Sequence, residues 1–438
     1  MSDLSKLALI SGPVWAVFTT LGVAALLWLL LVGKRYVLIT VPLAVAAALT
    51  VTAAVWFVTE RVWNVWGAPQ PLQLYVPIGL SLLALALAAP RFLRGRRIPA
   101  RLATAVAVPL VLLAAAVNVN AYYGNYPTLG TLTGTGVQIQ ALPTTPAAPA
   151  PGPVVTPTAL TTEASWNPPP DMPTHGTVAQ TTIPGTVSGV KPGGGFVWLP
   201  PAYLASPRAV VPVLVLLHGV PGGSMDWIAG GQLPELMDAY AAAHKGLAPI
   251  IVMPDANQGS VAEPTLCMDT SHGKAATYLA ADVPGWIKST LDAGHGSARN
   301  WAVAGFSYGG TCALQLAVNF PAVFPTFIDI SGENAPTIPA GQQALINGYF
   351  NGDAAAFARQ NPLDVLKTGN FPDTAGLITV GAADSFYKPQ GEQVYAAAKA
   401  TGMNVTLQTV PGSHTWQAWR AGLANNLDWL MQRYGVVP

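Results

Sequence analysis

Four long apolar runs in the first 124 residues restrict the fold of this chain more than any other feature. A helix needs ~20 apolar residues to cross the hydrocarbon core of a bilayer. The runs extend over Leu7–Val32, Val37–Val58, Leu74–Ala89 and Leu102–Val119. The third has spanning length only if it begins at Pro71, and the first is too long for a cleaved signal peptide. We therefore predict a transmembrane α-helical bundle of four spans over residues 1–126.

Basic residues flank these runs unequally, and cytoplasmic loops of membrane proteins carry an excess of Lys and Arg. The loop after the first run contains Lys34 and Arg35, whereas the opposite side has only Lys6 and Arg61. The loop after the third run is the most basic, with Arg91, Arg94, Arg96, Arg97 and Arg101. Both basic loops are therefore predicted to be cytoplasmic, so both ends of this multi-pass chain should lie on the extracytoplasmic side of the cell membrane.

The spans contain almost no ionisable side chains, although transporters and proton pathways usually place such groups inside the membrane. A plain anchor is the simplest interpretation of the bundle. A lateral surface that docks lipid and supplies it to the rest of the protein is the alternative. Residues 127–172 follow, and they are rich in Pro, Thr, Ala and Gly, with an uncharged, proline-rich stretch over Leu142–Thr158. This composition is typical of an extended linker.

From about residue 173 the sequence alternates between short apolar runs and longer helical patterns, which predicts βαβ units and a mostly parallel, doubly wound sheet. The expected strands are Phe196–Leu199, Val211–Leu217, Ile250–Met253, Trp301–Ala304, Phe327–Ile330, Leu377–Val380 and Val405–Val410. The expected helices are Leu233–His244, Ala276–Ala293, Thr311–Phe320, Gly391–Ala400 and Trp416–Tyr434. Residues 173–438 are thus predicted to form one α/β domain.

The apolar first part of the chain has a net positive charge, and the remainder has a net negative charge. Residues 1–139 hold nine Lys and Arg against two Asp and Glu, whereas residues 140–438 hold twelve against eighteen. An acidic second part argues against a nucleic-acid partner, because phosphate binding needs a basic surface. No P-loop, H-E-x-x-H or strand-linked G-x-G-x-x-G is present, so no metal or other cofactor is expected. Cys267 and Cys312 are compatible with one disulfide or with two free thiols.

The segment Gly305-Phe-Ser307-Tyr-Gly309 lies between a strand pattern and a helix pattern, which is the context of a nucleophile elbow. Glycines two residues before and after the serine avoid a clash in such a tight turn. Ser307 is therefore the candidate nucleophile. Its oxyanion hole would use the backbone N–H of Tyr308 and, from the turn His218-Gly-Val-Pro-Gly-Gly223, that of Val220. His218 itself is expected to be structural.

A serine nucleophile needs a base. In α/β proteins with a nucleophile elbow, the acid and the histidine follow the serine in that order. His414 is the one histidine after Ser307. Asp384 follows a strand pattern thirty residues before His414 and is the candidate that orients the imidazole. The rival carboxylates Asp353, Asp364 and Asp373 lie in a polar insertion with no apolar strand before them.

These residues together resemble the putative-esterase branch of the α/β-hydrolases, which includes esterase D-like enzymes and the secreted mycolyltransferases of mycobacteria. The resemblance covers about residues 185–435 and implies that residues 173–438 form an α/β-hydrolase catalytic domain. It rests on Val197–Tyr203, His218-Gly219, Ile251–Asp255, Gly305–Gly309 and Gly412–Trp416. This chain departs from the mycolyltransferases in its aspartate triad acid, in the histidine that begins its oxyanion turn, and in its four spans.

The sequence thus predicts a membrane-anchored serine esterase or acyltransferase that acts outside the cytoplasm on a small-molecule, lipid or cell-envelope ester through an acyl-enzyme. Two alternatives remain. A serine peptidase could use the same fold, and a non-catalytic envelope scaffold could use the domain for binding. The oligomeric state is not predicted.

Overall fold

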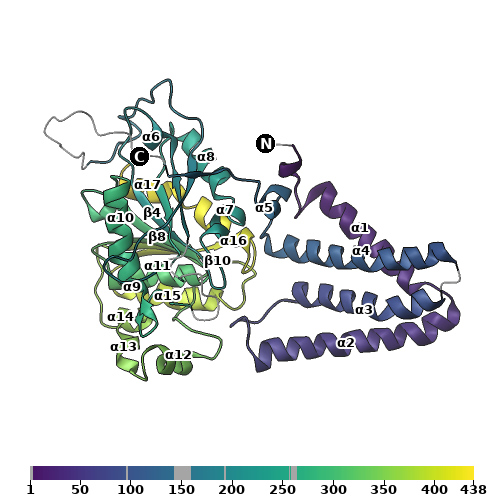
Figure 1. The fold of residues 1–438 in the computed structure, drawn as a ribbon. Helices are drawn as coiled ribbons and strands as arrows, with labels where there is room; N and C mark the ends of the chain where they lie inside the picture. The colour runs from purple at the N-terminus through teal and green to yellow at the C-terminus, as the bar shows by residue number, and fades with distance from the viewer. Residues whose placement is uncertain (1–2, 95–96, 143–158, 192–193, 256, 258–263) are drawn as a thin grey trace. The chain divides into compact units, whose positions relative to one another are not determined.

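A computed structural model describes residues 3–94, 97–142, 159–191, 194–255, 257 and 264–438. The chain forms two compact units, Met1–Gly136 and Val137–Pro438 (Figure 1). Each unit has its own hydrophobic core. Most of the proline-rich stretch of the expected linker, at 143–158, lies outside the described residues, as does Arg96.

Within the described residues, four helices of the first unit are long and apolar enough to cross a membrane. They are α1 (Gly12–Leu30), the segment Tyr36–Val62 that contains α2 (Val41–Phe57), α3 (Leu72–Arg94) and α4 (Ile98–Tyr123). Two short helices, Asp3–Lys6 and α5 (Leu129–Thr133), flank them. Large apolar side chains along them are exposed, among them Leu43 and Leu102. The predicted bundle of four apolar helices is confirmed.

Small residues set the spacing of these helices. A Cβ atom on Gly22 of α1 would lie 2.2 Å from the Cβ of Ala114 on α4, so the two helices can approach closely only with glycine at that position. The side chains of Leu29, Leu87 and Val111 lie in the small core that the helices share. The unit is therefore held by close backbone approach and by a narrow apolar core.

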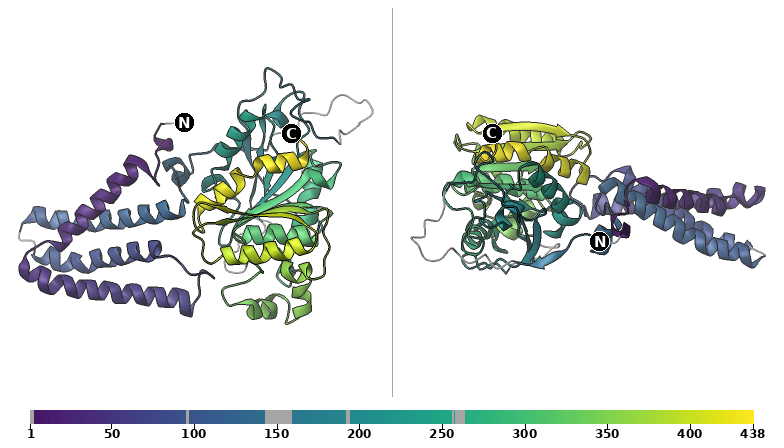
Figure 2. Two further views of the ribbon diagram at one scale, coloured as in Figure 1. Left: turned by 180° about the vertical axis from the view of Figure 1, so that it is seen from behind. Right: turned by 90° about the horizontal axis from the view of Figure 1, so that it is seen from above.

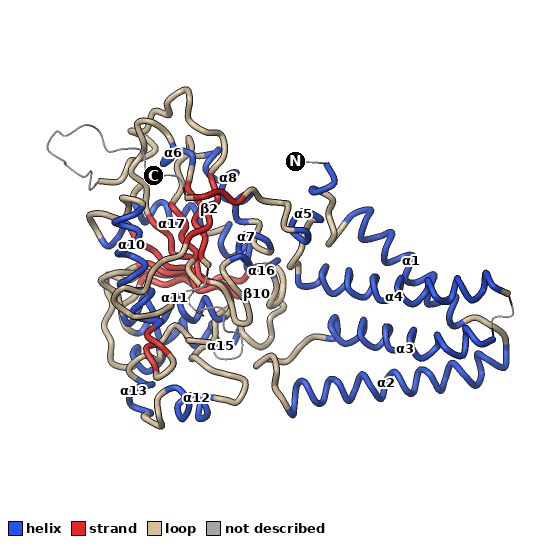
Figure 3. The backbone as a smooth tube through the Cα atoms, viewed as in Figure 1, coloured by secondary structure: helices blue, strands red, loops and turns tan. Residues whose placement is uncertain are grey.

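One nine-stranded sheet organises the described part of the second unit (Figure 3). Its spatial order is β1-β2-β3-β5-β4-β8-β9-β10-β11, and it is parallel except where β3 pairs with β2 and β5. The strands are β1 (Ile139–Ala141), β2 (Thr177–Thr181), β3 (Gly195–Leu199), β4 (Val213–Leu217), β5 (Ile250–Met253), β8 (Trp301–Phe306), β9 (Thr326–Ile330), β10 (Ala375–Gly381) and β11 (Asn404–Val410). The seven predicted strands are all present, and the predicted doubly wound fold is confirmed.

Helices cover both faces of this sheet (Figure 2). On one face lies α15 (Lys388–Ala400), where Gly391 packs against Val380 of β10. On the other face lies α16 (Trp416–Ala424), where Gly422 packs against Ile330 of β9. The remaining α-helices among the described residues of this unit are α6 (Pro201–Leu204), α7 (Met225–Ala229), α8 (Leu233–Ala243), α9 (Ala275–Thr277), α10 (Val283–Thr290), α11 (Tyr308–Asn319), α12 (Gln342–Tyr349), α13 (Ala354–Ala358), α14 (Pro362–Leu366) and α17 (Leu427–Tyr434). Strands β6 (Asp269–Thr270) and β7 (Gly273–Lys274) form a separate hairpin.

Two predicted helices are interrupted in the structure. The expected helix Trp416–Tyr434 divides into α16 and α17 at Asn426, whose side-chain amide donates to the Gly422 carbonyl and to the Thr379 hydroxyl. An asparagine that bonds its own backbone competes with the helical pattern. The expected helix Ala276–Ala293 consists instead of α9, a π-helical turn over Tyr278–Asp282 and α10.

Part of the segment expected to be a linker belongs to the second unit. Strand β1 pairs with β2, and Trp166 is buried in the core with its indole N–H donating to the Lys245 carbonyl. A proline-rich composition does not exclude single aromatic anchors, and their burial ties the flanking residues to the domain. The division at residues 126 and 172 stays a prediction.

Candidate active site

The predicted triad residues follow three parallel strands of the sheet. Ser307 follows β8, Asp384 lies just after β10, and His414 lies in the loop after β11. Parallel strands end at the same edge of a sheet, and loops from this edge form the sites of such folds. The topology therefore gathers side chains that are between 30 and 107 residues apart in the sequence.

A strained turn presents Ser307. Its φ of 53° and ψ of −128° lie in a region that residues with a Cβ atom rarely adopt. The Ser307 N–H donates to the Ile330 carbonyl at 2.8 Å, which ties the turn to β9. A Cβ on Gly305 would lie 2.3 Å from the backbone of Gly309, so the glycines are required by close backbone approach.

Two hydrogen bonds join the three side chains. His414 Nε2 lies 2.9 Å from Ser307 Oγ, and His414 Nδ1 lies 3.1 Å from Asp384 Oδ2. Asp384 is buried, and its Oδ1 accepts from the N–H of Tyr387 at 3.0 Å. A carboxylate held by a backbone donor presents its second oxygen in a defined direction, so the imidazole has one preferred orientation.

Two aromatic side chains that the sequence analysis did not single out hold the imidazole. The Tyr387 ring stacks on the His414 ring with centroids 3.9 Å apart, and Trp419 meets it edge-on at 5.0 Å. The sequence offered one signal for Tyr387. A residue three positions after an aspartate commonly donates its N–H to that carboxylate, as at the start of a helix. Trp419 had no comparable signal, because its position depends on the packing of α16.

The expected oxyanion donors lie beside the nucleophile. Tyr308 is the first residue of α11, where backbone N–H groups have no acceptor within the helix. A Cβ on Gly219 would lie 3.2 Å from the Cβ of Ser307, so the turn that contains Val220 runs next to the serine. His218 is buried, with Nδ1 2.8 Å from the Gly219 carbonyl and Nε2 3.6 Å from Asp255.

The rival carboxylates have other partners. Asp353 caps α13 by accepting from the Ala356 N–H, and Asp364 binds Lys367 and Asn361. Asp373 lies in the loop before β10, and its backbone carbonyl accepts from Arg433. The structure thus brings Asp384, and none of these three, into hydrogen bonding with His414.

Two further carboxyl-bearing residues lie against the first turn of α11, which follows the candidate nucleophile. Burial raises the pKa of Asp329 to about 7, although the Gly332 N–H donates to its Oδ1. Burial also raises the pKa of Glu333 to about 8, and this side chain interacts electrostatically with Tyr308 and Tyr387. Glu333 follows β9, and its Oε2 is buried without a hydrogen-bond partner among the described residues. Near neutral pH the Glu333 side chain is therefore a neutral acid, and its backbone N–H donates to Thr311 Oγ1 in the first turn of α11 at 2.7 Å.

Cys267 and Cys312 form a disulfide between α11 and the loop that precedes β6. The Tyr308 hydroxyl donates to the Leu266 carbonyl at 3.0 Å and ties the same loop to the start of α11. The sequence was compatible with a disulfide or with two free thiols, and the structure contains the disulfide. Among the described residues, no group of three or more His, Cys, Asp or Glu side chains is arranged to hold a metal ion.

Comparison with known proteins decides the family. Residues 192–430 match the family described as putative esterase. The chain belongs to this family. An uncharacterised protein of Corynebacterium glutamicum is 31% identical over 403 residues, which cover 90% of this chain and 89% of that protein. The relative is thus similar over more than the esterase domain.

Solved structures show the same fold. A ferulic acid esterase aligns with a TM-score of 0.52 and 20% identity, and it covers 59% of this esterase and 98% of that chain. An S-formylglutathione hydrolase from Agrobacterium tumefaciens aligns with a TM-score of 0.50 and 20% identity, covering 60% and 97%. The chain is therefore an esterase-type serine hydrolase whose catalytic domain has the α/β-hydrolase fold and which carries four membrane-type helices.

Proposed function

We propose that this esterase is anchored in the cell membrane and acts on the extracytoplasmic side on a lipid or cell-envelope ester. Its nucleophile is Ser307, with His414 as base and Asp384 as the group that orients it. The observation that carries this proposal is the continuous pair of hydrogen bonds from Ser307 through His414 to Asp384. No other described carboxylate is hydrogen-bonded to the ring of His414.

The first half of the reaction forms an acyl-enzyme. Ser307 Oγ attacks the ester carbonyl while His414 Nε2 takes its proton, and Asp384 stabilises the resulting imidazolium. The backbone N–H groups of Tyr308 and Val220 stabilise the tetrahedral oxyanion. When the intermediate collapses, the bond to the alcohol oxygen breaks, and His414 returns the proton to the leaving alcohol.

The second half reverses these steps with a new nucleophile. Water gives hydrolysis, and a second alcohol gives acyl transfer, because both attack the same acyl-enzyme. His414 again accepts the proton and then returns it to Ser307 Oγ. The same residues therefore support an esterase and an acyltransferase.

The membrane placement rests on the charges at the helix ends. Lys34, Arg35, Arg91 and Arg94 lie at one end of the four helices, where the chain passes from α1 to α2 and from α3 to α4. Short basic loops favour the cytoplasm. The esterase domain follows α4 at the opposite helix end, which supports an extracytoplasmic catalytic domain.

A fluorophosphonate probe tests the nucleophile. The full-length protein should be labelled, Ser307→Ala should abolish labelling, and His414→Ala should slow it by at least ~1000-fold if the imidazole is the base. Ser289→Ala, which removes an exposed hydroxyl on α10, is the matched control and should label normally. Equal labelling of Ser307→Ala and the parent would disprove the assignment.

The side of the membrane needs a separate test. A membrane-impermeant fluorophosphonate added to intact cells should label the protein as well as it does after lysis. Labelling that requires lysis would place the domain in the cytoplasm. Lipid profiles of membranes with the parent or with Ser307→Ala would then identify the ester, and cleavage of peptides in preference to esters would reject the proposed substrate class.

A further inference from the structure

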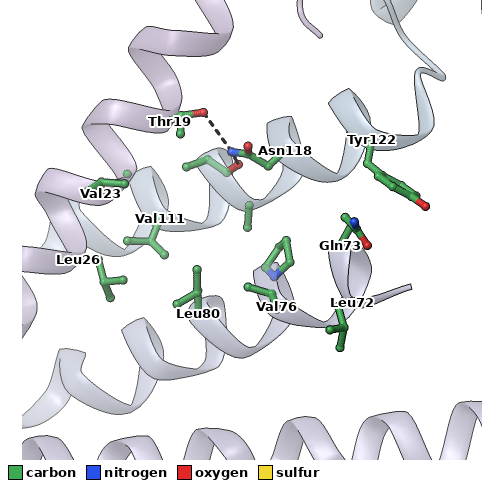
Figure 4. Close-up of a pocket in the computed structure, with 14 residues that line it drawn as sticks. Thr19, Val23, Leu26, Leu72, Gln73, Val76, Leu80, Val111, Asn118 and Tyr122 are labelled. Atoms are coloured by element: carbon green, nitrogen blue, oxygen red, sulfur yellow. Dashed lines mark hydrogen bonds between the residues drawn. The ribbon is translucent and has the colours of Figure 1, made fainter. Parts of the chain in front are cut away.

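A cavity of about 520 Å³ lies within the helical unit, between α1, α3 and α4 (Figure 4). Each helix contributes residues three or four positions apart, which is the spacing of a single helix face. Thr19, Val23 and Leu26 come from α1, and Val76 and Leu80 come from α3. We call this space the bundle pocket. Its volume lies within the ~300–1,000 Å³ of typical ligand pockets.

Small residues create the bundle pocket. Gly22 lets α1 approach α4 at Ala114, while α3 packs on α4 from another side. Ala114 and Ala115 line the pocket on α4, where larger side chains would fill it. Val23 and Val76 also line it and are more than half exposed, so apolar side chains surround a space that this unit does not fill itself.

The bundle pocket is polar at one end only. Thr19, Gln73, Asn118 and Tyr122 lie towards the helix ends remote from the basic loops, whereas Val23, Leu26, Leu80 and Val111 line the rest (Figure 4). This arrangement suits an amphiphile, whose polar group would lie nearer one surface of the membrane than its hydrocarbon chain.

Hydrogen bonding at the polar end is incomplete. Asn118 Nδ2 donates to Thr19 Oγ1 at 3.0 Å and to the Ala114 carbonyl at 2.8 Å. Among the described residues, no group donates to Oδ1 of Asn118. No Asp, Glu, Lys, Arg or His is among the lining residues of the pocket. The polar end therefore offers neutral donors and acceptors, which match an ester or a hydroxyl group better than a charged head group.

We propose that the bundle pocket binds the acyl or alkyl chain of a neutral lipid ester or alcohol, with the lipid oxygen at the level of Asn118. A methylene group is about as large as a water molecule, which occupies about 30 Å³, so the pocket holds on the order of fifteen methylenes. Apolar cavities do not retain water. In the membrane, hydrocarbon is the solvent that can enter between α1 and α3.

A photoreactive lipid tests this site in the full-length protein. The probe is a monoacylglycerol with a diazirine in its chain, in phosphatidylcholine vesicles. Cross-links should concentrate on the pocket-facing residues of α1, α3 and α4. Ala115→Phe should lower this labelling by roughly tenfold, because the ring fills the space of the chain. Ala116→Phe, one residue along the same helix but exposed, is the matched control and should label like the parent.

The polar end has its own variant. Asn118→Leu should weaken labelling by the monoacylglycerol severalfold but leave labelling by a diazirine alkane, which has no oxygen, unchanged. Equal effects on both probes would overturn the assignment of the lipid oxygen to Asn118. Ala115→Met replaces Ala115→Phe if the phenylalanine variant does not assemble, and it should give a smaller loss in the same direction.

Two results would overturn the lipid site. Labelling spread evenly over outward-facing residues, or equal labelling of Ala115→Phe and Ala116→Phe, would mean that no specific site exists. Cross-links between two copies of the chain at the pocket, with no lipid labelling, would identify it as a helix interface. Fluorophosphonate labelling of Ser307 in each variant separates this inference from the proposed activity, because it reports the catalytic domain alone.

Discussion

At the residue scale, Glu333 shows how burial changes the chemistry of a side chain without changing its identity. An exposed glutamate is an anion at neutral pH, whereas burial raises the pKa of Glu333 to about 8. The Glu333 N–H donates to Thr311 Oγ1 in the first turn of α11, so the neutral form of this residue adds no negative charge near the helix start where the proposed oxyanion would develop. An anion in the same place would oppose that oxyanion, because like charges repel strongly in a site of low dielectric constant.

The pH dependence of the reaction should therefore report Glu333. Below pH 8 the Glu333 side chain is mostly protonated and adds no charge to the site. Above pH 8 it ionises, and its negative charge raises the free energy of the anionic transition state. The parent should lose roughly tenfold in kcat/KM for a p-nitrophenyl ester between pH 8 and pH 9.5, which corresponds to about 1.4 kcal/mol. Glu333→Gln should keep its activity over this range. Glu392→Gln, an exposed residue of α15, should follow the parent, and parallel profiles for Glu333→Gln and the parent would contradict this role.

At the scale of single elements, the turn between β8 and α11 requires glycine on both sides of Ser307, at positions 305 and 309. A Cβ on Gly309 would lie 2.5 Å from the Leu217 carbonyl oxygen and 2.7 Å from that of His218. The first atom belongs to the last residue of β4, and the second belongs to the first residue of the oxyanion turn. The elbow and the oxyanion turn therefore constrain each other.

Substitution of Gly309 tests this constraint. Gly309→Ala should lower the free energy of unfolding by more than about 2 kcal/mol, because backbone must move to admit the methyl group. Gly285→Ala in α10, where no atom lies within 4 Å of the added Cβ, should be neutral or stabilise by about 0.5–1 kcal/mol. Urea unfolding gives both values, and equal stability of the two variants would contradict the close contact.

The disulfide links α11, the helix that follows the elbow, to the loop that precedes β6. It closes a loop of 45 residues between Cys267 and Cys312, for which loss of chain entropy in the unfolded state predicts roughly 4 kcal/mol of stabilisation. Reduction should therefore lower the urea midpoint of the parent. The double variant Cys267→Ser/Cys312→Ser should be less stable and insensitive to reductant. An unchanged midpoint after complete reduction would show that the loop is held by other contacts, such as the Tyr308 hydroxyl.

At the scale of the whole molecule, the two units have separate cores, and the helices of the first unit expose large apolar side chains. Among the described residues, the large core of Val137–Pro438 contains no side chain from Met1–Gly136. The proposed triad residues and the aromatic rings that pack on His414 all belong to the second unit. The first unit therefore supplies none of the proposed triad residues, and its proposed role is to hold the esterase domain at the membrane.

The second unit should fold alone. Expressed as residues 137–438, it should be soluble, unfold in one cooperative transition and react with fluorophosphonate at a rate within about threefold of the full chain in detergent. Ser307→Ala in this shorter protein is the control for specific labelling. Aggregation or loss of labelling on removal of residues 1–136 would show that the helices support the catalytic fold.

Much of this protein follows from local sequence patterns. Apolar runs long enough to span a bilayer predicted four helices, because lipid leaves the backbone few other ways to satisfy its hydrogen bonds. Alternating short apolar runs predicted seven of the nine strands of the described sheet. The glycines of Gly305–Gly309 predicted the elbow, because the clash they avoid arises between residues close in the sequence.

Tertiary packing decided the rest, because those features join residues that the sequence keeps far apart. The break at Asn426, the burial of Trp166 and the rings of Tyr387 and Trp419 around His414 depend on neighbours from other elements. The raised pKa of Glu333 depends on burial, which no local pattern encodes. The amino-acid sequence by itself determined which groups could react and where the chain could cross a membrane. Only the folded chain determined which groups meet, since contact at hydrogen-bonding distance is a property of packing.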